Sequence, residues 1–172
     1  MHVILFRHGP AGNPDPVRWP SDVDRPLTPK GIGRTRKAAR GLRRITGDVA
    51  FILSSPYVRA LGTARILGQA LGVTTVETLD ALAAGSSPRG VLTALGRLSS
   101  EQHVVLVGHE PDLGRLAGLM TGAGIALPLK KAGACAIGFD GAAAAGGGSL
   151  LWLLPPRVLR LLGGKELAPH ER

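Results

Sequence analysis

The sequence predicts an α/β protein in which a mostly parallel, mixed sheet lies between two layers of helices. Short runs rich in valine, isoleucine and leucine alternate with longer segments of helical periodicity, which is typical of a sheet covered by helices on both faces. The chain has 172 residues, enough for one domain with a substantial core. We therefore expect a single three-layer α/β/α domain over residues 1–163 and a partly disordered tail over 164–172.

The strands are predicted from six apolar runs, and the helices from the pattern between them. The expected strands are His2–Phe6, Ala50–Leu53, Val73–Val76, Val104–Val107, Ala134–Phe139 and Ser149–Leu153. The segment "DGAAAAGGGS" before the last strand has the composition of a hairpin loop. Four predicted helices share a proline at or near their first turn. We expect them from Pro29 to Ile45, from Pro56, from Pro88 to Leu98 and from Pro111. Thr28 is the expected cap of the first and Ser55 the expected cap of the second.

Composition limits the partners and the compartment. The formal net charge of +9 attracts nucleic acid, acidic proteins or phosphorylated ligands, but aromatic residues make up only 3%, which argues against a nucleic-acid partner. The single cysteine, Cys135, permits no internal disulfide and suits a reducing compartment. The apolar runs at Val3–Phe6 and after Ser149 are too short for a signal peptide or a membrane helix. We expect a cytoplasmic, monomeric protein with no membrane partner.

Polar segments follow three of the predicted strands: "RHGP" the first, "SSPYVRA" the second and "GHEP" the fourth. In open α/β sheets ligands bind beyond the carboxyl ends of the strands, so Arg7, His8, Arg59 and His109 should converge there. Arginine forks match the oxygens of a phosphoryl group. No acidic cluster accompanies these histidines, so we expect no metal.

Two histidines among arginines suit different roles. The charged form of such a histidine is disfavoured, so His8 can stay neutral and offer a lone pair to phosphorus, while His109 can donate a hydrogen bond to the phosphoryl oxygens. Each residue alone has a plainer explanation, a histidine at a strand exit or an arginine on a helix surface. Their joint occurrence in this chain order favours a phosphate site.

Across essentially its whole length the chain resembles the histidine phosphatase superfamily, with its phosphoglycerate mutase-like fold. The resemblance rests on "RHG", "SSPYVRALGTA" and "GHEPDL", and "DRPLTPKG" and the short length are similar to the SixA branch of phosphohistidine phosphatases. It implies that His8 is a transiently phosphorylated nucleophile, that Arg7, Arg59 and His109 form the phosphate pocket, and that no cofactor is needed. It also implies that Arg25 lies near the substrate phosphate; the other interpretation of Arg25 is a loop arginine paired with Asp24.

Larger members of the superfamily place an acid after the third strand. Here that region, "LDALAAGSSPRG", contains only one acid, Asp80, the candidate general acid. Glu110 has two interpretations: it orients water or, as we prefer, it accepts a helix-start N–H. An alkoxide must be protonated as it leaves, whereas a phosphorylated imidazole can already carry a proton on its other nitrogen.

The acid-poor site therefore favours hydrolysis of phosphohistidine on a phosphorelay or phosphocarrier protein. The alternatives are a small-molecule phosphatase for sugar or nucleotide phosphates, a mutase, and a basic nucleic-acid-binding module.

Overall fold

A six-stranded mixed sheet forms the centre of the computed structural model, which describes residues 1–98 and 102–164. Its strands are β1 (His2–Arg7), β2 (Phe51–Ser54), β3 (Val76–Thr78), β4 (His103–Gly108), β5 (Ala134–Gly138) and β6 (Ser149–Leu154). They lie in the order β3-β2-β4-β1-β5-β6. The first four are mutually parallel, and β5 and β6 add to β1 as an antiparallel hairpin. The predicted mostly parallel, mixed sheet is confirmed.

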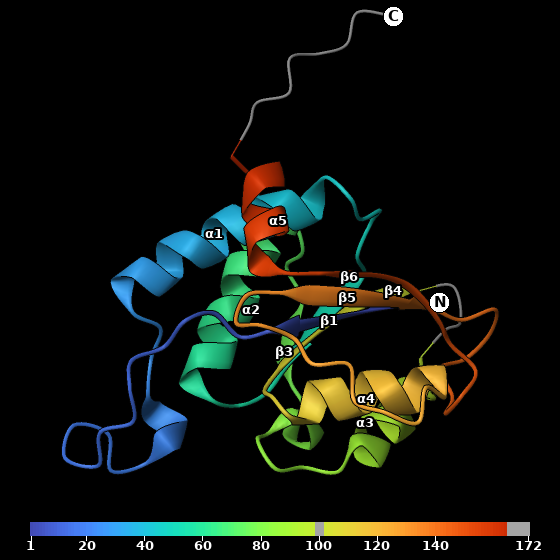
Figure 1. The fold of residues 1–172 in the computed structure, drawn as a ribbon, viewed down its shortest axis with the longest axis horizontal. Coiled ribbons are helices and arrows are strands. Elements are labelled where there is room, and N and C mark those ends of the chain that lie inside the picture. Colours follow the sequence, from blue (N-terminus) through green and yellow to red (C-terminus); the bar gives the residue numbers. More distant parts are fainter. Residues whose placement is uncertain (99–101, 165–172) are drawn as a thin grey trace, which may run out of the picture.

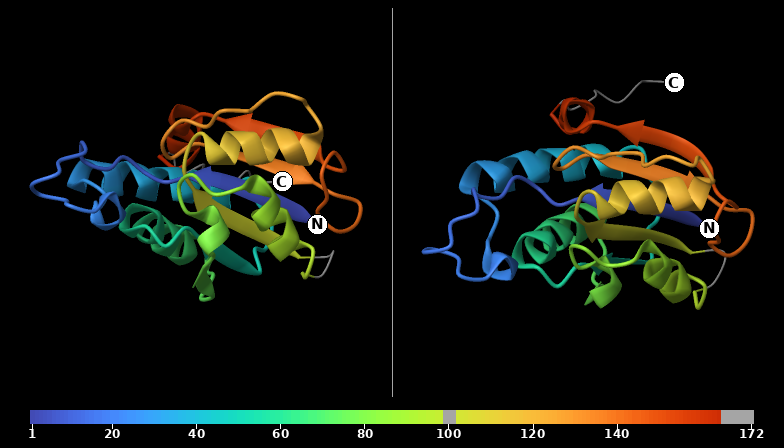
Figure 2. Two further views of the ribbon diagram at one scale, coloured as in Figure 1. Left: turned by 90° about the horizontal axis from the view of Figure 1, so that it is seen from below. Right: turned by 60° about the horizontal axis from the view of Figure 1, so that its bottom comes forward.

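Helices cover both faces of this sheet (Figures 1 and 2). They are α1 (Pro29–Arg43), α2 (Val58–Leu71), α3 (Pro88–Leu95), α4 (Asp112–Thr121) and α5 (Pro156–Leu162), with short 3-10 turns η1 (Asp22–Asp24) and η2 (Asp80–Leu82). One face carries α1, α2 and α5, and the other carries α3 and α4. The expected three layers are therefore present. None of the described helices has the length and apolar character needed to cross a membrane.

The alternation of side chains along β1 shows how the sheet divides the core. Val3 and Leu5 pack with α3 and α4, while Ile4 and Phe6 pack with α1, α2 and α5. Successive strand side chains point to opposite faces, and a strand buried on both faces reads as a continuous apolar run. This is why "HVILF" was recognisable as a central strand.

Some predicted boundaries are wrong for local reasons. The second helix was expected from Pro56 with Ser55 as its cap, but it begins at Val58 after Tyr57. The Ser55 hydroxyl instead bonds to the imidazole of His109, which follows β4. The third strand was expected at Val73–Val76 and forms at Val76–Thr78, since the Val73 N–H still bonds to Gly68 in the end of α2.

Other elements agree with the sequence or add to it. The Thr28 hydroxyl accepts the Gly31 N–H at 2.9 Å, so the predicted cap of α1 is confirmed. The helices α1 and α3 end at Arg43 and Leu95, before the expected Ile45 and Leu98. Helix α5 was not predicted. The expected tail lies, except for residue 164, outside the described residues.

Candidate active site

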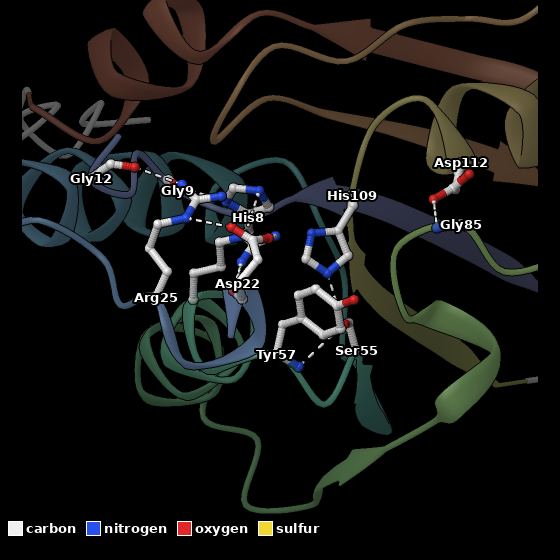
Figure 3. Close-up of polar contacts among 11 residues, drawn as sticks. His8, Gly9, Gly12, Asp22, Arg25, Ser55, Tyr57, Gly85, His109 and Asp112 are labelled. Atoms are coloured by element: carbon white, nitrogen blue, oxygen red, sulfur yellow. Dashed lines mark hydrogen bonds and ion pairs between the residues drawn. The ribbon is translucent and has the colours of Figure 1, made fainter. Parts of the chain in front are cut away.

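The three segments "RHGP", "SSPYVRA" and "GHEP" meet at one edge of the sheet. They follow β1, β2 and β4, which are neighbours in the order β2-β4-β1, and the register pairs Arg7 at the end of β1 with Gly108 at the end of β4. The next residues are His8 and His109, whose ring centres lie 5.0 Å apart. Figure 3 shows the two rings side by side.

A cavity of about 250 Å³ opens in front of these histidines. Four predicted site residues, Arg7, His8, Arg59 and His109, line it together with Arg25. The rest of the lining is Gly12, Asn13, Pro14, Ala84, Glu110 and Lys131. The cavity therefore combines four cationic side chains with one carboxyl group. Among the residues that the structure describes, no cluster of three or more histidines, cysteines, aspartates or glutamates could hold a metal.

His8 is held neutral with one ring nitrogen free of a proton. His8 is 5% exposed. Its Nδ1 lies 2.7 Å from the carbonyl oxygen of Gly9, which can only accept a hydrogen bond, so Nδ1 carries the proton and Nε2 carries the lone pair. Burial is the main cause that lowers the His8 pKa to about 3, helped by the charges of Arg59 and Arg7. Nε2 accepts only a long hydrogen bond, 3.3 Å, from Nε of Arg59.

Gly9 must be a glycine for this arrangement. A Cβ there would collide with the hydroxyl of Thr35 on α1, and the Gly9 N–H donates to the Thr63 hydroxyl on α2 at 3.0 Å. Two helices thus pack against Gly9, whose carbonyl orients the His8 ring. The "G" of "RHG" is required by close packing.

His109 presents its other nitrogen to the site. Its Nε2 lies 2.8 Å from the hydroxyl of Ser55, which also accepts the Tyr57 N–H at 3.3 Å. The buried Ser55 hydroxyl hydrogen has no other acceptor among the described residues, so we assign the hydroxyl as the donor to Nε2 and the ring proton to Nδ1. That buried nitrogen has no partner among the described residues. Burial is the main cause that lowers the His109 pKa to about 4, with Arg59 adding to it, so Nδ1–H is a neutral donor available to a ligand.

The arginines are fixed by acceptors beside the cavity. Arg7 donates from one terminal nitrogen to the Leu129 carbonyl at 2.8 Å, and its buried Nε has no partner in the described part of the chain. Arg25 donates from Nε to the carboxylate of Asp22 at 2.7 Å. The interpretation that pairs Arg25 with Asp24 is wrong, because the 3-10 turn brings residues three apart onto one face.

The predicted acid does not reach the cavity. Asp80 begins η2, is exposed and does not line the pocket. The loop after η2 instead places Ala84 at the cavity, and Asp112 of α4 anchors that loop through the Gly85 N–H at 2.7 Å. The site described here thus contains no contribution from Asp80.

Glu110 is the carboxyl group that does line the cavity. Its Oε1 accepts the Leu129 N–H at 2.9 Å. Burial raises its pKa above the ordinary value, against the effects of the Leu129 hydrogen bond and of the charge of Arg7. Glu110 was expected to accept a helix-start N–H, but the hydrogen bond that forms comes from Leu129, in the loop before β5.

Two site residues were missed from the sequence. Lys131 lines the cavity from the loop before β5, and no local pattern marks it. Asp22 bonds to both Arg25 and Arg59. The sequence signal for it is its place three residues before Arg25 in "DVDR", a spacing that suits an ion pair across one turn.

Comparison with known proteins agrees with this geometry. The family model of the histidine phosphatase superfamily (branch 1) matches residues 3–84. An uncharacterized protein of Picosynechococcus is 39% identical over 137 residues, which are 77% of this chain and 82% of that protein. The phosphohistidine phosphatase SixA of Escherichia coli is 30% identical over 119 residues, 67% of this chain and 71% of that protein.

Solved structures share the whole fold. The structure of the protein histidine phosphatase SixA complexed with tungstate has a TM-score of 0.82 and 26% identity, and the match covers 92% of this chain and 99% of that one. A putative phosphohistidine phosphatase SixA from Agrobacterium tumefaciens has a TM-score of 0.72 at 23% identity, over 90% of this chain and 97% of that one. The fold is therefore the phosphoglycerate mutase-like fold of SixA, and the chain belongs to the histidine phosphatase superfamily.

Proposed function

We propose that this phosphatase hydrolyses phosphohistidine on a protein through a covalent intermediate on His8. The observation that carries the proposal is a neutral, buried histidine whose Nε2 lone pair lies in a pocket of cations. A lone pair beside guanidinium groups suits attack on a phosphoryl group, because the same cations bind its oxygens.

The reaction has two displacement steps. His8 Nε2 attacks phosphorus, the bond from phosphorus to the substrate imidazole breaks, and the electron pair returns to that imidazole, which leaves neutral if its other nitrogen carries a proton. A water oxygen then attacks phosphorus, the bond to Nε2 breaks, the electron pair returns to Nε2, and inorganic phosphate departs with both hydrogens of the water. Arg7, Arg25, Arg59 and the Nδ1–H of His109 stabilise the charge on the phosphoryl oxygens in both steps.

The preference for a nitrogen leaving group follows from the acids near the cavity. Asp80 lies outside it, and one carboxyl oxygen of Glu110 accepts the Leu129 N–H. An alkoxide would depart without a ready proton donor, whereas an imidazole does not need one. The similarity to the phosphohistidine phosphatase SixA supports the same preference.

The size of the cavity favours a macromolecular substrate. At about 250 Å³ it lies below the range of sites that enclose a whole drug-sized ligand. It suits a phosphoryl group and an attached ring, while the rest of the substrate stays outside. A phosphorelay or phosphocarrier protein fits this requirement.

The test is a rapid-quench experiment with a radiolabelled phosphohistidine protein. We expect acid-labile label on the wild-type enzyme and none on His8→Ala. His2→Gln is the matched control, because His2 is an exposed histidine at the opposite end of the same strand. Turnover without any label on the wild-type enzyme would exclude the covalent mechanism.

A small-molecule phosphatase is the second candidate, favoured by the raised pKa of Glu110 at the cavity. It predicts faster hydrolysis of alkyl phosphates than of phosphohistidine, and loss of that activity in Glu110→Gln or Asp80→Asn. We expect both variants to keep phosphohistidine hydrolysis within about fivefold of wild type, less than the effect of removing a general acid.

A further inference from the structure

Asp22 joins two of the arginines that line the cavity. One carboxylate oxygen accepts Nε of Arg25 at 2.7 Å, and the other accepts a terminal nitrogen of Arg59 at 2.8 Å. The backbone carbonyl of Asp22 accepts the other terminal nitrogen of Arg59 at 2.6 Å. One residue thus supplies three acceptors to two guanidinium groups.

The carboxylate contacts these arginines from outside the cavity. Arg25 and Arg59 line the pocket, whereas Asp22 does not, and its side chain is 50% exposed. Figure 3 shows the Asp22 carboxylate beside Arg25, with the dashed line between them marking their ion pair. Each guanidinium has five N–H groups, and Asp22 occupies only some of them. Arg25 also donates to the Gly12 carbonyl at 2.6 Å and Arg59 to His8 at 3.3 Å, so about three N–H groups of Arg25 and about two of Arg59 remain for a ligand in the pocket.

Electrostatics explains why a carboxylate stands here. Two adjacent guanidinium groups repel each other, and a negative charge between them offsets that repulsion. The hydrogen bond from Arg25, followed by the charge of Arg59, lowers the pKa of Asp22 against the effect of burial, so the carboxylate is ionised at neutral pH. Asp24, in the same turn, forms no side-chain hydrogen bond or ion pair with the described residues.

We infer that Asp22 is a positioning residue, which holds Arg25 and Arg59 at the separation that lets one phosphoryl group bind both. This inference rests on the proposed function, because that function requires the pocket to take a phosphoryl group. Asp22 does not touch the reacting atoms. Its effect is expected on phosphate affinity more than on the chemical step.

The experiment compares Asp22→Asn with Asp24→Asn. Both remove one negative charge from η1, but only the first removes a contact to the arginines. We measure the dissociation constant of inorganic phosphate by calorimetry, which needs no turnover, and KM and kcat with a phosphohistidine protein. For Asp22→Asn we expect phosphate affinity and KM to worsen roughly 10-fold, the loss typical of one charge-assisted hydrogen bond, with kcat changed less than about threefold.

The control variants show whether the contact or the charge matters. Asp24→Asn should stay within about twofold of wild type, since its charge contacts neither arginine. In an Arg25→Gln background, Asp22→Asn should lose part of its effect, because paired residues are non-additive. Asp22→Glu, which keeps the charge, should recover part of the affinity.

Three results would overturn the inference. The first is tighter phosphate binding by Asp22→Asn, which would make the carboxylate a competitor of the ligand. The second is a loss of phosphate affinity in Asp24→Asn equal to that in Asp22→Asn. The third is an unchanged phosphate affinity in Asp22→Asn. Thermal unfolding without phosphate identifies a variant that has failed to fold, and Asp22→Glu then carries the comparison. If the wild type binds phosphate but does not hydrolyse phosphohistidine, the proposed function fails while the role of Asp22 is still measured.

Discussion

At the scale of single residues, the site depends on two imidazoles that stay uncharged among cations. Burial is the largest cause of both low pKa values, about 3 for His8 and about 4 for His109. A protonated His8 would have no lone pair, so the burial that disfavours its charge also keeps the nucleophile ready. The same burial makes the fold sensitive to acid.

The first prediction concerns this sensitivity. A histidine whose pKa is lowered on folding binds fewer protons in the folded state than in the unfolded state, so the free energy of unfolding decreases as the pH falls from 6.5 toward 4. For His8 the expected decrease is on the order of 3 kcal/mol over that interval. Urea unfolding at a series of pH values measures it.

Variants assign the effect to the two histidines. In His8→Gln and His109→Gln the dependence of unfolding free energy on pH should be shallower than in the wild type, because one titrating group is absent. An unchanged slope in both variants would show that neither pKa is lowered in the folded protein.

At the scale of elements, α1 and α5 approach so closely that only glycine fits between them. A Cβ on Gly41 of α1 would collide with the Leu159 carbonyl of α5, and a Cβ on Gly163 would collide with the Lys37 carbonyl of α1. The guanidinium of Arg44 also donates to the Leu162 carbonyl at 2.6 Å. This contact fixes α5 over the face that holds α1 and α2.

The second prediction tests this contact. Gly41→Ala should lower the free energy of unfolding by roughly 1–3 kcal/mol, the usual cost of forcing extra volume into a packed interior. Gly33→Ala is the matched control on the same helix, where a Cβ meets nothing within 4 Å. It should raise stability by about 0.5–1 kcal/mol, because alanine favours a helix over glycine. Equal effects of the two changes in urea unfolding would contradict the close approach.

How far these elements could be predicted depends on what fixes their ends. The central strands were predicted within about one residue, because runs buried on both faces are apolar throughout. The start of α2 was wrong because the Ser55 hydroxyl bonds to His109, which comes from a different strand. The seven residues of α5 are too few for periodicity to mark a helix.

Site residues, too, could be predicted where local sequence fixes their position and not where long-range contacts do. His8 and His109 were found because a strand end is a local feature and parallel strands share an edge. Lys131 lies on a loop and Asp22 in the short 3-10 turn η1, and the positions of both segments depend on long-range contacts. No local pattern could have placed Asp80 outside the cavity.

At the scale of the whole molecule, the sheet separates two cores, and the single cysteine lies in one of them. Cys135 on β5 belongs to the core cluster that also contains Leu116 and Met120 of α4, and burial raises its thiol pKa to about 12. A thiol reagent needs a thiolate and access, so the native protein should react very slowly. Detachment of the edge strand β6 would leave the thiol covered by α4.

The third prediction follows: labelling of Cys135 should report the unfolding of the whole molecule. A ligand that binds only the folded state lowers the unfolded population by 1 + [L]/Kd, so inorganic phosphate at 100 times its Kd should slow labelling about 100-fold. The rate should also rise with urea with the same slope as global unfolding. If β5 were exposed by local opening while the phosphate pocket stayed intact, phosphate would leave the labelling rate unchanged.

Two variants separate anion binding from catalysis as the source of this protection. His8→Ala, which keeps the arginines, should retain the phosphate effect. Arg59→Gln should reduce it, because the protection comes from anion binding and not from catalysis.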